Sequence, residues 1–437
     1  MSDAKAREED PDTGPVADLD AAVEEADLET VKPAGLLRKN RDFRLLWIGQ
    51  SLSNLGGSVS GVAFPLLVLA LTGSATKAGI AGFAANAPFV LLQLPAGAYV
   101  DRWNRRAVML WSDVGRALAL ASVVVALLLG SLTFAHILVV AVIETSLFVT
   151  FRLAEGAALR TIVSDEAQLG SAIALNQARG YGTSLAGEPL GGLLFGLRQA
   201  LPFAFDCISY VASLITVASI RTPLPAPSST ASRQLRREIK EGLRVAWDNV
   251  FLRTVSILSA GSDFVINGLF LVLIVITVRG GASSSQVGLM LAIGGAGGLI
   301  GALAASWAAE RVPSVRFVVV GVSTVAVLPI LLMATTDDPY VLGALLGVIL
   351  SVWPLYNAVV VSRWMTQVPD ELMGRVQAAV AVLGWAPVPV APILGGFLLD
   401  QVGNGPTVLI FAGVMAAVAT VVALSKAVRH ESTRATS

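Results

Sequence analysis

The chain has 437 residues, of which 54% are hydrophobic and 14% charged, and its formal net charge is +0. Soluble domains carry about a quarter charged residues, so this balance indicates a membrane protein and gives no sign of a nucleic-acid partner. A single cysteine excludes a disulfide within the chain, and with only two histidines, His136 and His430, the sequence offers no zinc-binding set and no catalytic cluster. It also contains no G-x-x-x-x-G-K-[ST] loop for binding a nucleotide. We therefore expect a protein without a metal or cofactor that is not an enzyme.

The chain begins with a polar, acidic stretch, residues 1–40, which we expect to be a disordered cytoplasmic tail. A bilayer core of about 30 Å needs roughly 20 apolar residues for each helix. Six apolar runs meet this length at 43–71, 76–100, 107–130, 134–158, 169–196 and 201–221. A polar linker, 222–250, separates them from six more at 252–278, 285–309, 315–334, 339–364, 374–401 and 406–427, and a short tail, 429–437, follows. The sequence therefore predicts an all-α membrane protein with twelve transmembrane helices.

Lysine and arginine mark one side of this predicted bundle. The loops on the other side hold only Lys77, Arg198 and Arg279, whereas most of the remaining basic residues fall on the side of the two tails and the central linker. Because basic loops stay in the cytoplasm, we expect both termini there. The high alanine, glycine and arginine content is typical of a GC-rich bacterial genome, so we expect a multi-pass protein of a bacterial plasma membrane.

The two sets of six helices resemble each other. Asn40 and Arg44 precede the first helix, and Asn249 and Arg253 precede the seventh, 209 positions later. The segment VSDEAQLG at 163–170 matches VPDELMG at 368–374, and a double glycine at 191–192 matches one at 395–396. These ordered matches indicate two copies of a six-helix unit, 41–221 and 251–428.

A charged motif follows the second predicted helix. It reads Gly97-x-x-x-Asp101-Arg102-x-x-Arg105-Arg106 and resembles the cytoplasmic motif of the major facilitator superfamily. The resemblance implies that this cluster holds the two halves together on the cytoplasmic side in one state. We expect Gly97 to allow close approach of a neighbouring helix and Asp101 to pair with an arginine or a helix N-terminus.

The fourth and fifth predicted helices carry ionisable groups at membrane depth. Glu144, Arg152 and Glu155 share one helical face, and Arg152 to Gly156 resembles an R-x-x-Q-G motif of proton-coupled members. This stripe predicts either a proton site or a static Arg152–Glu155 salt bridge. Gly187 to Gly192 resembles the G-P-x-x-G-G motif of antiporters, with Glu188 at the usual proline position. We expect Glu188 to carry a proton or cation, or else to pair with Arg179 or Arg152.

Further polar residues are candidates for the cavity. Asp263 lies mid-helix beside Asn267, and we expect Asp263 to join the proton-coupling candidates. Asp113 and Arg116 are expected to pair with each other or with the Asp101 cluster, and Asp206 to lie at the membrane interface. The expected substrate-cavity residues are Gln50, Asn54, Asn267, Trp353, Asn357 and Trp385. A mixture of polar and aromatic groups suits a bulky amphipathic ligand, but the polar ones equally suit hydrogen bonds between helices.

Four more segments, at 40–56, 241–253, 368–378 and 383–385, resemble the macrolide-efflux and enterobactin-exporter branch of the same superfamily. The resemblance covers about 390 residues. It implies a secondary transporter that exports a drug, antibiotic, siderophore or similar natural product by proton antiport and alternating access. We expect the protein to be a monomer. A lipid or lysophospholipid flippase, or an importer of small metabolites, remains the alternative on the same fold.

Overall fold

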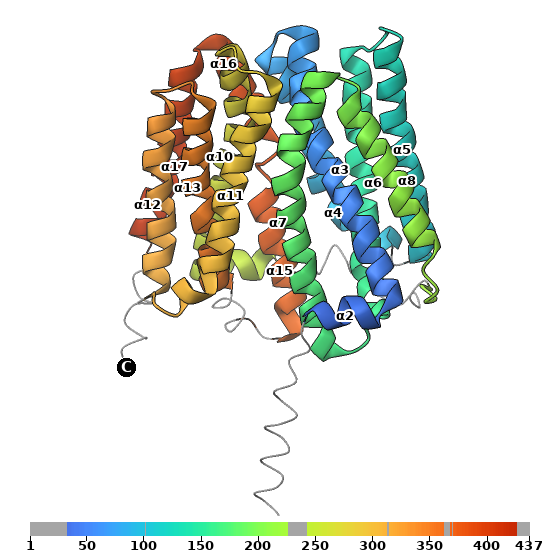
Figure 1. Cartoon of the computed structure of the whole chain (residues 1–437). Helices are drawn as coiled ribbons and strands as arrows, with labels where there is room; N and C mark the ends of the chain where they lie inside the picture. The colour runs from blue at the N-terminus through green and yellow to red at the C-terminus, as the bar shows by residue number, and fades with distance from the viewer. Residues whose placement is uncertain are drawn as a thin grey trace, which may run out of the picture.

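The computed structural model describes residues 33–100, 102–225, 243–312, 314–361, 368 and 370–425. These residues form a bundle of long helices joined by short connections, with no strand among them (Figure 1). Eleven helices of this described part are long and apolar enough to cross a membrane. The helix Glu166–Leu197 is not among the eleven, since it carries Gln168, Asn176, Gln177 and Arg179. Twelve crossings therefore remain a prediction.

The first group of helices follows the predicted order. The helices are α2 (Pro33–Lys39), α3 (Arg41–Thr72), α4 (Ala75–Val100), α5 (Arg105–Leu128), α6 (Phe134–Ile162), α7 (Glu166–Leu197) and α8 (Leu201–Ala218). The short helix α2 differs from the prediction because it lies inside the expected disordered tail. Its Leu36 is buried among Phe43 and other apolar side chains, and this burial explains the extra turn of structure. Residues 1–32, most of the central linker and the C-terminal tail lie outside the described residues.

The second group of helices occupies the other side of Figure 1. The elements are α10 (Val250–Arg279), α11 (Ser284–Ala309), α12 (Val315–Met333), α13 (Pro339–Tyr356), the π-helical turn η1 (Asn357–Val361), α15 (Asp370–Trp385), α16 (Val390–Gln401) and α17 (Asn404–Leu424). The predicted helix 339–364 thus changes to π geometry after Tyr356. Pro354 lies inside the end of α13 and cannot donate a backbone hydrogen bond, which favours irregular geometry there.

Most of the predicted run 374–401 forms one candidate membrane span, Ala379–Gln401, but the helix within it is interrupted between α15 and α16. Pro387 and Pro389 fall in the interruption and lack the N–H groups that would continue the helix. The chain instead makes tight turns in which Val388 N donates to Trp385 O at 3.1 Å and Val390 N donates to Pro387 O at 3.1 Å. The corresponding stretch of α7 has no such proline pair and stays helical throughout.

The repeat in the sequence is also visible in the caps of the first long helix of each group. Asn40 caps α3 by accepting a hydrogen bond from Phe43 N at 2.9 Å. Asn249 caps α10 in the same way, accepting from Phe251 N at 2.9 Å. An asparagine side chain satisfies the unpaired N–H groups of the first helical turn, so the repeated residue has the same structural role twice.

The two groups of helices meet along two seams. One seam joins α7 to α11, and the other joins α4 to α16. Glycines allow both: a side chain at Gly192 would meet Gly288 of α11 at 2.9 Å, and one at Gly79 would meet Ile393 of α16 at 2.9 Å. The contacts involve the C-terminal half of α7 and the N-terminal half of α4, which lie at the top of Figure 1. We call this the closed end of the molecule.

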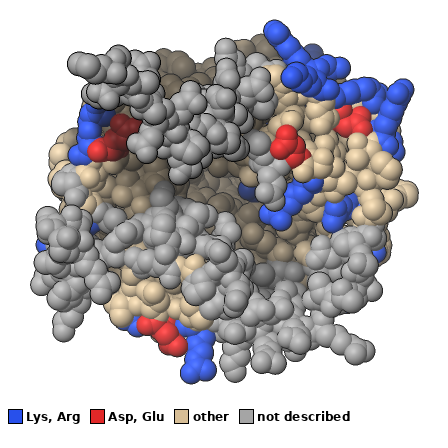
Figure 2. Space-filling view, turned by 90° about the horizontal axis from the view of Figure 1, so that it is seen from below, with Lys and Arg blue, Asp and Glu red and all other residues tan. Residues whose placement is uncertain are grey.

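At the opposite end, the described part of the molecule is hollowed, and we call this the open end. Figure 2 shows this face from below, with lysine and arginine side chains around its rim and a hollow near its centre. The described basic residues therefore gather on the face that the sequence predicts to be cytoplasmic. The orientation itself remains a prediction.

Candidate functional site

A cavity of about 380 Å³ lies between the two groups of helices. It is lined by α3, α4, α6 and α7 on one side and by α10, α11 and α16 on the other. Its polar lining residues are Ser58, Ser60, Asn86, Glu144, Thr145, Glu188 and Asn267. Apolar side chains such as Phe64, Phe270 and Leu291 make up most of the rest of the wall. A mainly apolar cavity with a few polar groups is the usual form of a small-molecule site.

Glu188 reaches this cavity from α7 at the seam with α11. A side chain at Gly288 would meet the Glu188 backbone oxygen at 2.7 Å, and one at Gly295 would lie 3.9 Å from Glu188 Oε2. Among the described residues, the carboxylate has no hydrogen-bond or ion-pair partner. The expected pairing with Arg179 or Arg152 is therefore wrong for this structure. Glu188 is an acid without a counter-charge at a contact between the two halves.

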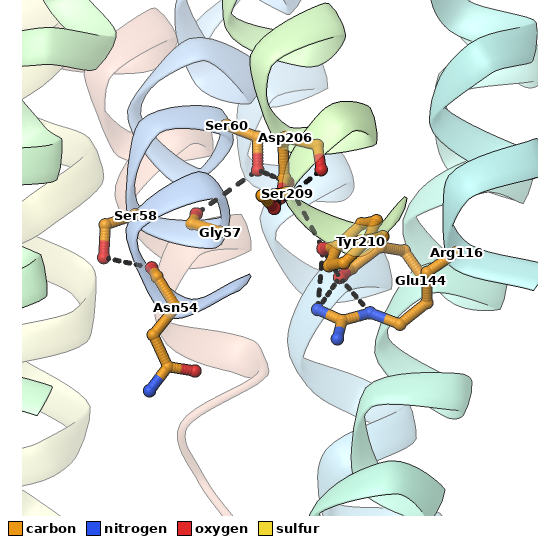
Figure 3. A network of polar contacts seen from close by, with 9 residues as sticks. All are labelled: Asn54, Gly57, Ser58, Ser60, Arg116, Glu144, Asp206, Ser209 and Tyr210. Atoms are coloured by element: carbon orange, nitrogen blue, oxygen red, sulfur yellow. Dashed lines mark hydrogen bonds and ion pairs between the residues drawn. The ribbon is translucent and has the colours of Figure 1, made fainter. Parts of the chain in front are cut away.

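Glu144 reaches the same cavity from α6, but its charge is paired. Arg116 of α5 donates to Glu144 Oε1 from Nε at 3.0 Å and from Nη2 at 2.6 Å. The same Nη2 lies 2.7 Å from the Tyr210 hydroxyl, whose ring also stacks against the guanidinium at 4.1 Å. Figure 3 shows these side chains converging from three helices. We call Arg116, Glu144, Tyr210, Asp206 and Ser60 the Arg116 network.

Asp206 completes the network in the interior of the N-terminal group. It accepts a hydrogen bond from Ser60 Oγ at 2.5 Å, from Tyr210 Oη at 3.2 Å and from Ser209 Oγ at 3.0 Å (Figure 3). The side chain is fully buried, so the expected position at the membrane interface is wrong. The second turn of α8, which carries Asp206, therefore lies deeper in the bundle than its place near the start of a helix indicates.

The expected Asp113–Arg116 pair is also replaced by other contacts. Asp113 accepts from Ser213 Oγ at 2.7 Å, and Arg116 turns to Glu144 instead. The signal that could have found this pairing is depth, because Arg116 and Glu144 both lie near the middle of their spans in adjacent antiparallel helices. A charge in the membrane interior needs a partner at its own depth.

The expected Arg152–Glu155 salt bridge does not form. Glu155 pairs instead with Arg179 of α7 at 3.0 Å, and Arg152 lies over the ring of Phe89 with 5.9 Å to its centroid. Phe89 in turn packs against Trp385 of α15 with ring centroids 4.8 Å apart. These side chains do not line the cavity, and they connect α6, α4 and α15 nearer the open face.

One of the six expected substrate residues, Asn267, lines the cavity, and its amide donates to Asp263 O at 2.8 Å. Gln50 is buried and donates to Ser213 Oγ at 2.9 Å, which is the helix-to-helix alternative. The remaining four do not line the cavity. Asn54 points away from the Arg116 network (Figure 3), and Asn357 begins η1. Trp353 stacks on Tyr356, and Trp385 contacts Phe89. The polar or aromatic character of a residue did not by itself distinguish residues that line the cavity from residues that form contacts between helices.

Asp263 lies in α10 outside the cavity lining. Its carboxylate faces α15, because a side chain at Gly384 would lie 3.8 Å from Asp263 Oδ2. No described residue makes a hydrogen bond or ion pair with this carboxylate. Asp263 and Glu188 are thus separate unpaired acids, and only Glu188 is in the cavity.

The charged motif after α4 makes its visible contacts within the N-terminal group. Arg105 donates to Ala157 O at 3.3 Å and to Thr161 Oγ1 at 3.0 Å, and Arg106 donates to Ala218 O. Arg102 lies in the turn before α5, and Asp101 lies outside the described residues. A side chain at Gly97 would meet no described residue within 4 Å, so the expected close approach of a helix is not seen among these residues.

A second charged cluster, which the sequence analysis missed, joins the halves at the closed end. Asp400 of α16 accepts hydrogen bonds from Ser74 Oγ at 3.1 Å, Ala75 N at 3.3 Å and Thr76 N at 2.8 Å. Arg279, at the end of α10, pairs with the same carboxylate at 2.5 Å. We call these five residues the Asp400 cluster. The carboxylate caps the N-terminus of α4, a helix of the other half.

Relatives of the chain are named as efflux proteins. It is 29% identical over 397 residues to the multidrug efflux pump Tap of Mycolicibacterium fortuitum, covering 85% of this chain and 92% of that one. Tap of Mycobacterium tuberculosis (strain ATCC 25618 / H37Rv) is 29% identical over 385 residues, with 84% and 89% covered. Macrolide efflux protein A of Streptococcus pyogenes is 24% identical over 233 residues, or 52% of this chain and 57% of that protein.

Solved structures of transporters share the fold. A mutant of the nucleoside transporter NupG superposes with a TM-score of 0.71 at 12% identity, covering 88% of this chain and 99% of that one. A bacterial homologue of the human lysosomal transporter Spinster, in an inward-facing conformation, gives 0.66 at 14% identity, with 91% and 98% covered. The sequence also matches the Major Facilitator Superfamily over residues 46–388 and 281–437. With its apolar helices, its cavity between two groups of helices and this match, the chain is a multi-pass membrane protein that belongs to the Major Facilitator Superfamily of transporters.

Proposed function

We propose that the protein exports small amphipathic compounds from the cytoplasm by proton antiport, in a bacterial plasma membrane and as a monomer. The observation that carries this proposal is the unpaired Glu188 carboxylate in a cavity between the two halves. Ionisable groups at membrane depth are expensive unless they are paired, and unpaired ones mark ion or substrate pathways. Export is favoured by the names of the efflux relatives.

Glu188 is suited to couple proton binding to the movement of the halves. Its backbone packs against Gly288 of α11, and its carboxylate faces the cavity. Loss or gain of a proton changes the charge at a seam that separates when the closed end opens. A two-state equilibrium responds to a ligand that binds the two states differently, and a proton on Glu188 meets that requirement. Glu144 is the second candidate, because it lines the same cavity, whereas Glu155, Arg152 and Asp263 lie outside it.

In the proposed cycle, the two ends of the molecule open in turn. With both termini in the cytoplasm, the hollow face is the cytoplasmic one, and the charged motif of Gly97, Asp101, Arg102, Arg105 and Arg106 would close it in the outward-facing state. The Asp400 cluster and the two glycine seams would close the outer end in the present state. Alternating access then requires that one set of contacts breaks as the other forms.

The proposal is tested by drug and siderophore accumulation in cells that lack their own efflux pumps. We expect the wild-type protein to lower accumulation, a protonophore to abolish the effect, and Glu188→Gln to reduce it about tenfold or more. Glu310→Gln is the matched control, because Glu310 is an exposed acid paired only with Arg311 at 3.6 Å. Export by Glu188→Gln that still responds to the protonophore would remove Glu188 from the coupling step.

Other outcomes separate the alternatives. Increased accumulation would indicate an importer. Unchanged accumulation across a broad panel, together with altered lysophospholipid distribution between the leaflets, would indicate a lipid flippase instead.

A further inference from the structure

Asp263 is an acid without a counter-charge in the middle of α10, outside the cavity lining. No described residue makes a hydrogen bond or ion pair with its carboxylate. Arg253 lies about 15 Å away along the helix axis and donates to Trp247 O at 3.3 Å. Arg279 lies about 24 Å away in the other direction and pairs with Asp400. A carboxylate at this depth therefore requires a proton or a bound cation.

Two hydroxyl groups lie beside Asp263. Ser259 is one turn before it on the same face of α10, and Ser259 Oγ is 3.2 Å from the hydroxyl of Tyr356 at the end of α13. Only one of the two hydroxyls donates in this contact, so the oxygen atom of each keeps a free lone pair. Tyr356 is buried, whereas Asp263 and Ser259 are half-buried, so the group is accessible to a small ion.

The interruption between α15 and α16 frees two backbone carbonyl groups. In a continuous helix, Leu383 O would accept a hydrogen bond from residue 387, which is a proline without an N–H group. Gly384 O would accept one from Val388 N, which donates to Trp385 O instead at 3.1 Å. Both carbonyl groups therefore lack the backbone donor that an uninterrupted helix would supply.

The freed carbonyl groups belong to the turn that packs against Asp263. A side chain at Gly384 would lie 3.8 Å from Asp263 Oδ2 and 3.6 Å from Ser259 Cβ. This turn is also the C-terminal end of α15, where the helix dipole places partial negative charge. A carboxylate, two hydroxyl oxygens and the negative end of a helix thus meet at one place between α10, α13 and α15.

This set of ligands suits a monovalent inorganic cation. Carbonyl groups at breaks in membrane helices, together with side-chain oxygens, are the ligands that sodium uses in transporters. Calcium sites commonly combine several carboxylates, whereas the described part of this group holds one. A single positive charge balances Asp263. The scarcity of histidine and cysteine has no bearing here, because such a cation binds oxygen atoms.

We propose that these five groups form a binding site for sodium within the C-terminal half. The site is separate from the cavity, so the inference goes beyond the proposed proton antiport. Asn267 connects the two, because its amide donates to Asp263 O at 2.8 Å and the residue lines the cavity. A bound sodium ion would also hold the end of α15 against α10 and α13.

The test is equilibrium binding of radioactive sodium to the purified full-length protein in detergent, with N-methyl-D-glucamine chloride keeping the ionic strength constant. We expect saturable binding by the wild type. Asp263→Asn keeps the shape of the side chain but removes its charge, and should weaken binding at least about tenfold. Ser259→Ala removes one neutral ligand and should weaken binding about three- to tenfold.

Two controls locate the site. Glu188→Gln and Glu310→Gln leave all five groups in place and should bind sodium within about twofold of the wild type. Thermal unfolding in N-methyl-D-glucamine chloride shows whether each variant is folded. If Asp263→Asn is not, Ser259→Ala decides the question, because it changes no charge.

Three results would overturn the inference. Absence of saturable binding, or binding that Asp263→Asn and Ser259→Ala leave unchanged, would mean that Asp263 is neutralised by a proton alone. Loss of binding in Glu188→Gln would place the sodium ion in the cavity. None of these results touches the proposed export, because the binding assay uses neither a gradient nor an exported compound.

Discussion

At the scale of single residues, Arg116 is the buried cation at the centre of the Arg116 network. Its guanidinium binds Glu144 and the Tyr210 hydroxyl and stacks on the Tyr210 ring. Through Tyr210 it also supports Asp206, which is fully buried. Removal of one member of a buried ion pair leaves an uncompensated charge, and this loss is larger than the net contribution of the pair.

Arg116→Gln is therefore expected to destabilise the protein by about 3 kcal/mol. The measurement is thermal unfolding of the purified protein in detergent. Arg116→Met with Glu144→Met removes both charges and should recover part of the loss. Arg311→Gln is the control, because the Arg311–Glu310 pair is exposed at both ends, and it should change stability by less than about 0.5 kcal/mol. A similar loss of stability in Arg116→Gln and Arg311→Gln would contradict the stabilising role of the Arg116 network.

The sequence indicated which residues are charged at membrane depth, but not their partners. Glu144, Glu155 and Glu188 were all identified, yet Glu144 pairs with Arg116 and Glu155 with Arg179. The spacing of residues within one helix predicts partners in that helix, whereas these pairs join different helices. Their distances depend on helix packing, which a single sequence does not specify. The Asp400 cluster was missed for the same reason.

At the scale of elements, glycines set the distance between the halves. Gly192 of α7 faces Ser284 and Gly288 of α11, and Gly396 of α16 faces Ala75 of α4. Without side chains, the helix backbones approach closely, as membrane helices commonly do at small residues. The repeated double glycine thus has the same function in both seams.

Gly192→Ala is expected to push α7 and α11 apart and to disfavour the closed end. Overpacking of about 1–3 kcal/mol shifts the ratio of closed to open ends by roughly tenfold. Spin labels at Ser131 and Asp337, exposed on opposite halves, report this change by pulsed electron resonance in a Cys207→Ser background. Gly413→Ala is the control, because a side chain there meets nothing within 4 Å. An unchanged distance distribution in Gly192→Ala would refute the role of the seam.

Most elements could be predicted from apolar runs and caps. The ranges of α3, α4 and α10 to α12 agree with the sequence to within a few residues, because long apolar runs end at charges, prolines or glycines. The interruption before α16 was missed, although Pro387 and Pro389 are visible in the sequence. Single prolines occur inside several other helices here, such as Pro65 in α3, so proline alone does not show where a helix stops.

At the scale of the whole molecule, the two ends differ in the contacts that their charged residues make. The closed end combines two glycine seams with the Asp400 cluster, which joins α16 to the N-terminus of α4 and to Arg279. At the open end, Arg105 and Arg106 bind backbone oxygens of α6 and α8 in their own half. Among the residues that the structure describes, the hydrogen bonds of the Asp400 cluster join the halves at the closed end.

Asp400→Ala is expected to shift the population toward opening of the closed end by about tenfold or more, since charge-assisted hydrogen bonds contribute about 1.5–3 kcal/mol each. Arg279→Gln removes the ion pair but leaves the bonds to Ala75 N and Thr76 N, so its effect should be smaller. The same spin-label pair measures both variants. Equal effects would mean that the ion pair alone, rather than the helix cap, holds this end.

The interruption between α15 and α16 makes the two repeats unequal in stiffness. α7 is a continuous rod of 32 residues, whereas its repeat counterpart has a joint at Ala386 to Pro389, next to the contact between Trp385 and Phe89. Above the joint, α16 stays attached to α4 through Asp400, and below it α15 belongs to the open face. We therefore expect the C-terminal half to bend at this joint and the N-terminal half, whose α7 is continuous, to move as one piece, so that the two repeats would move differently.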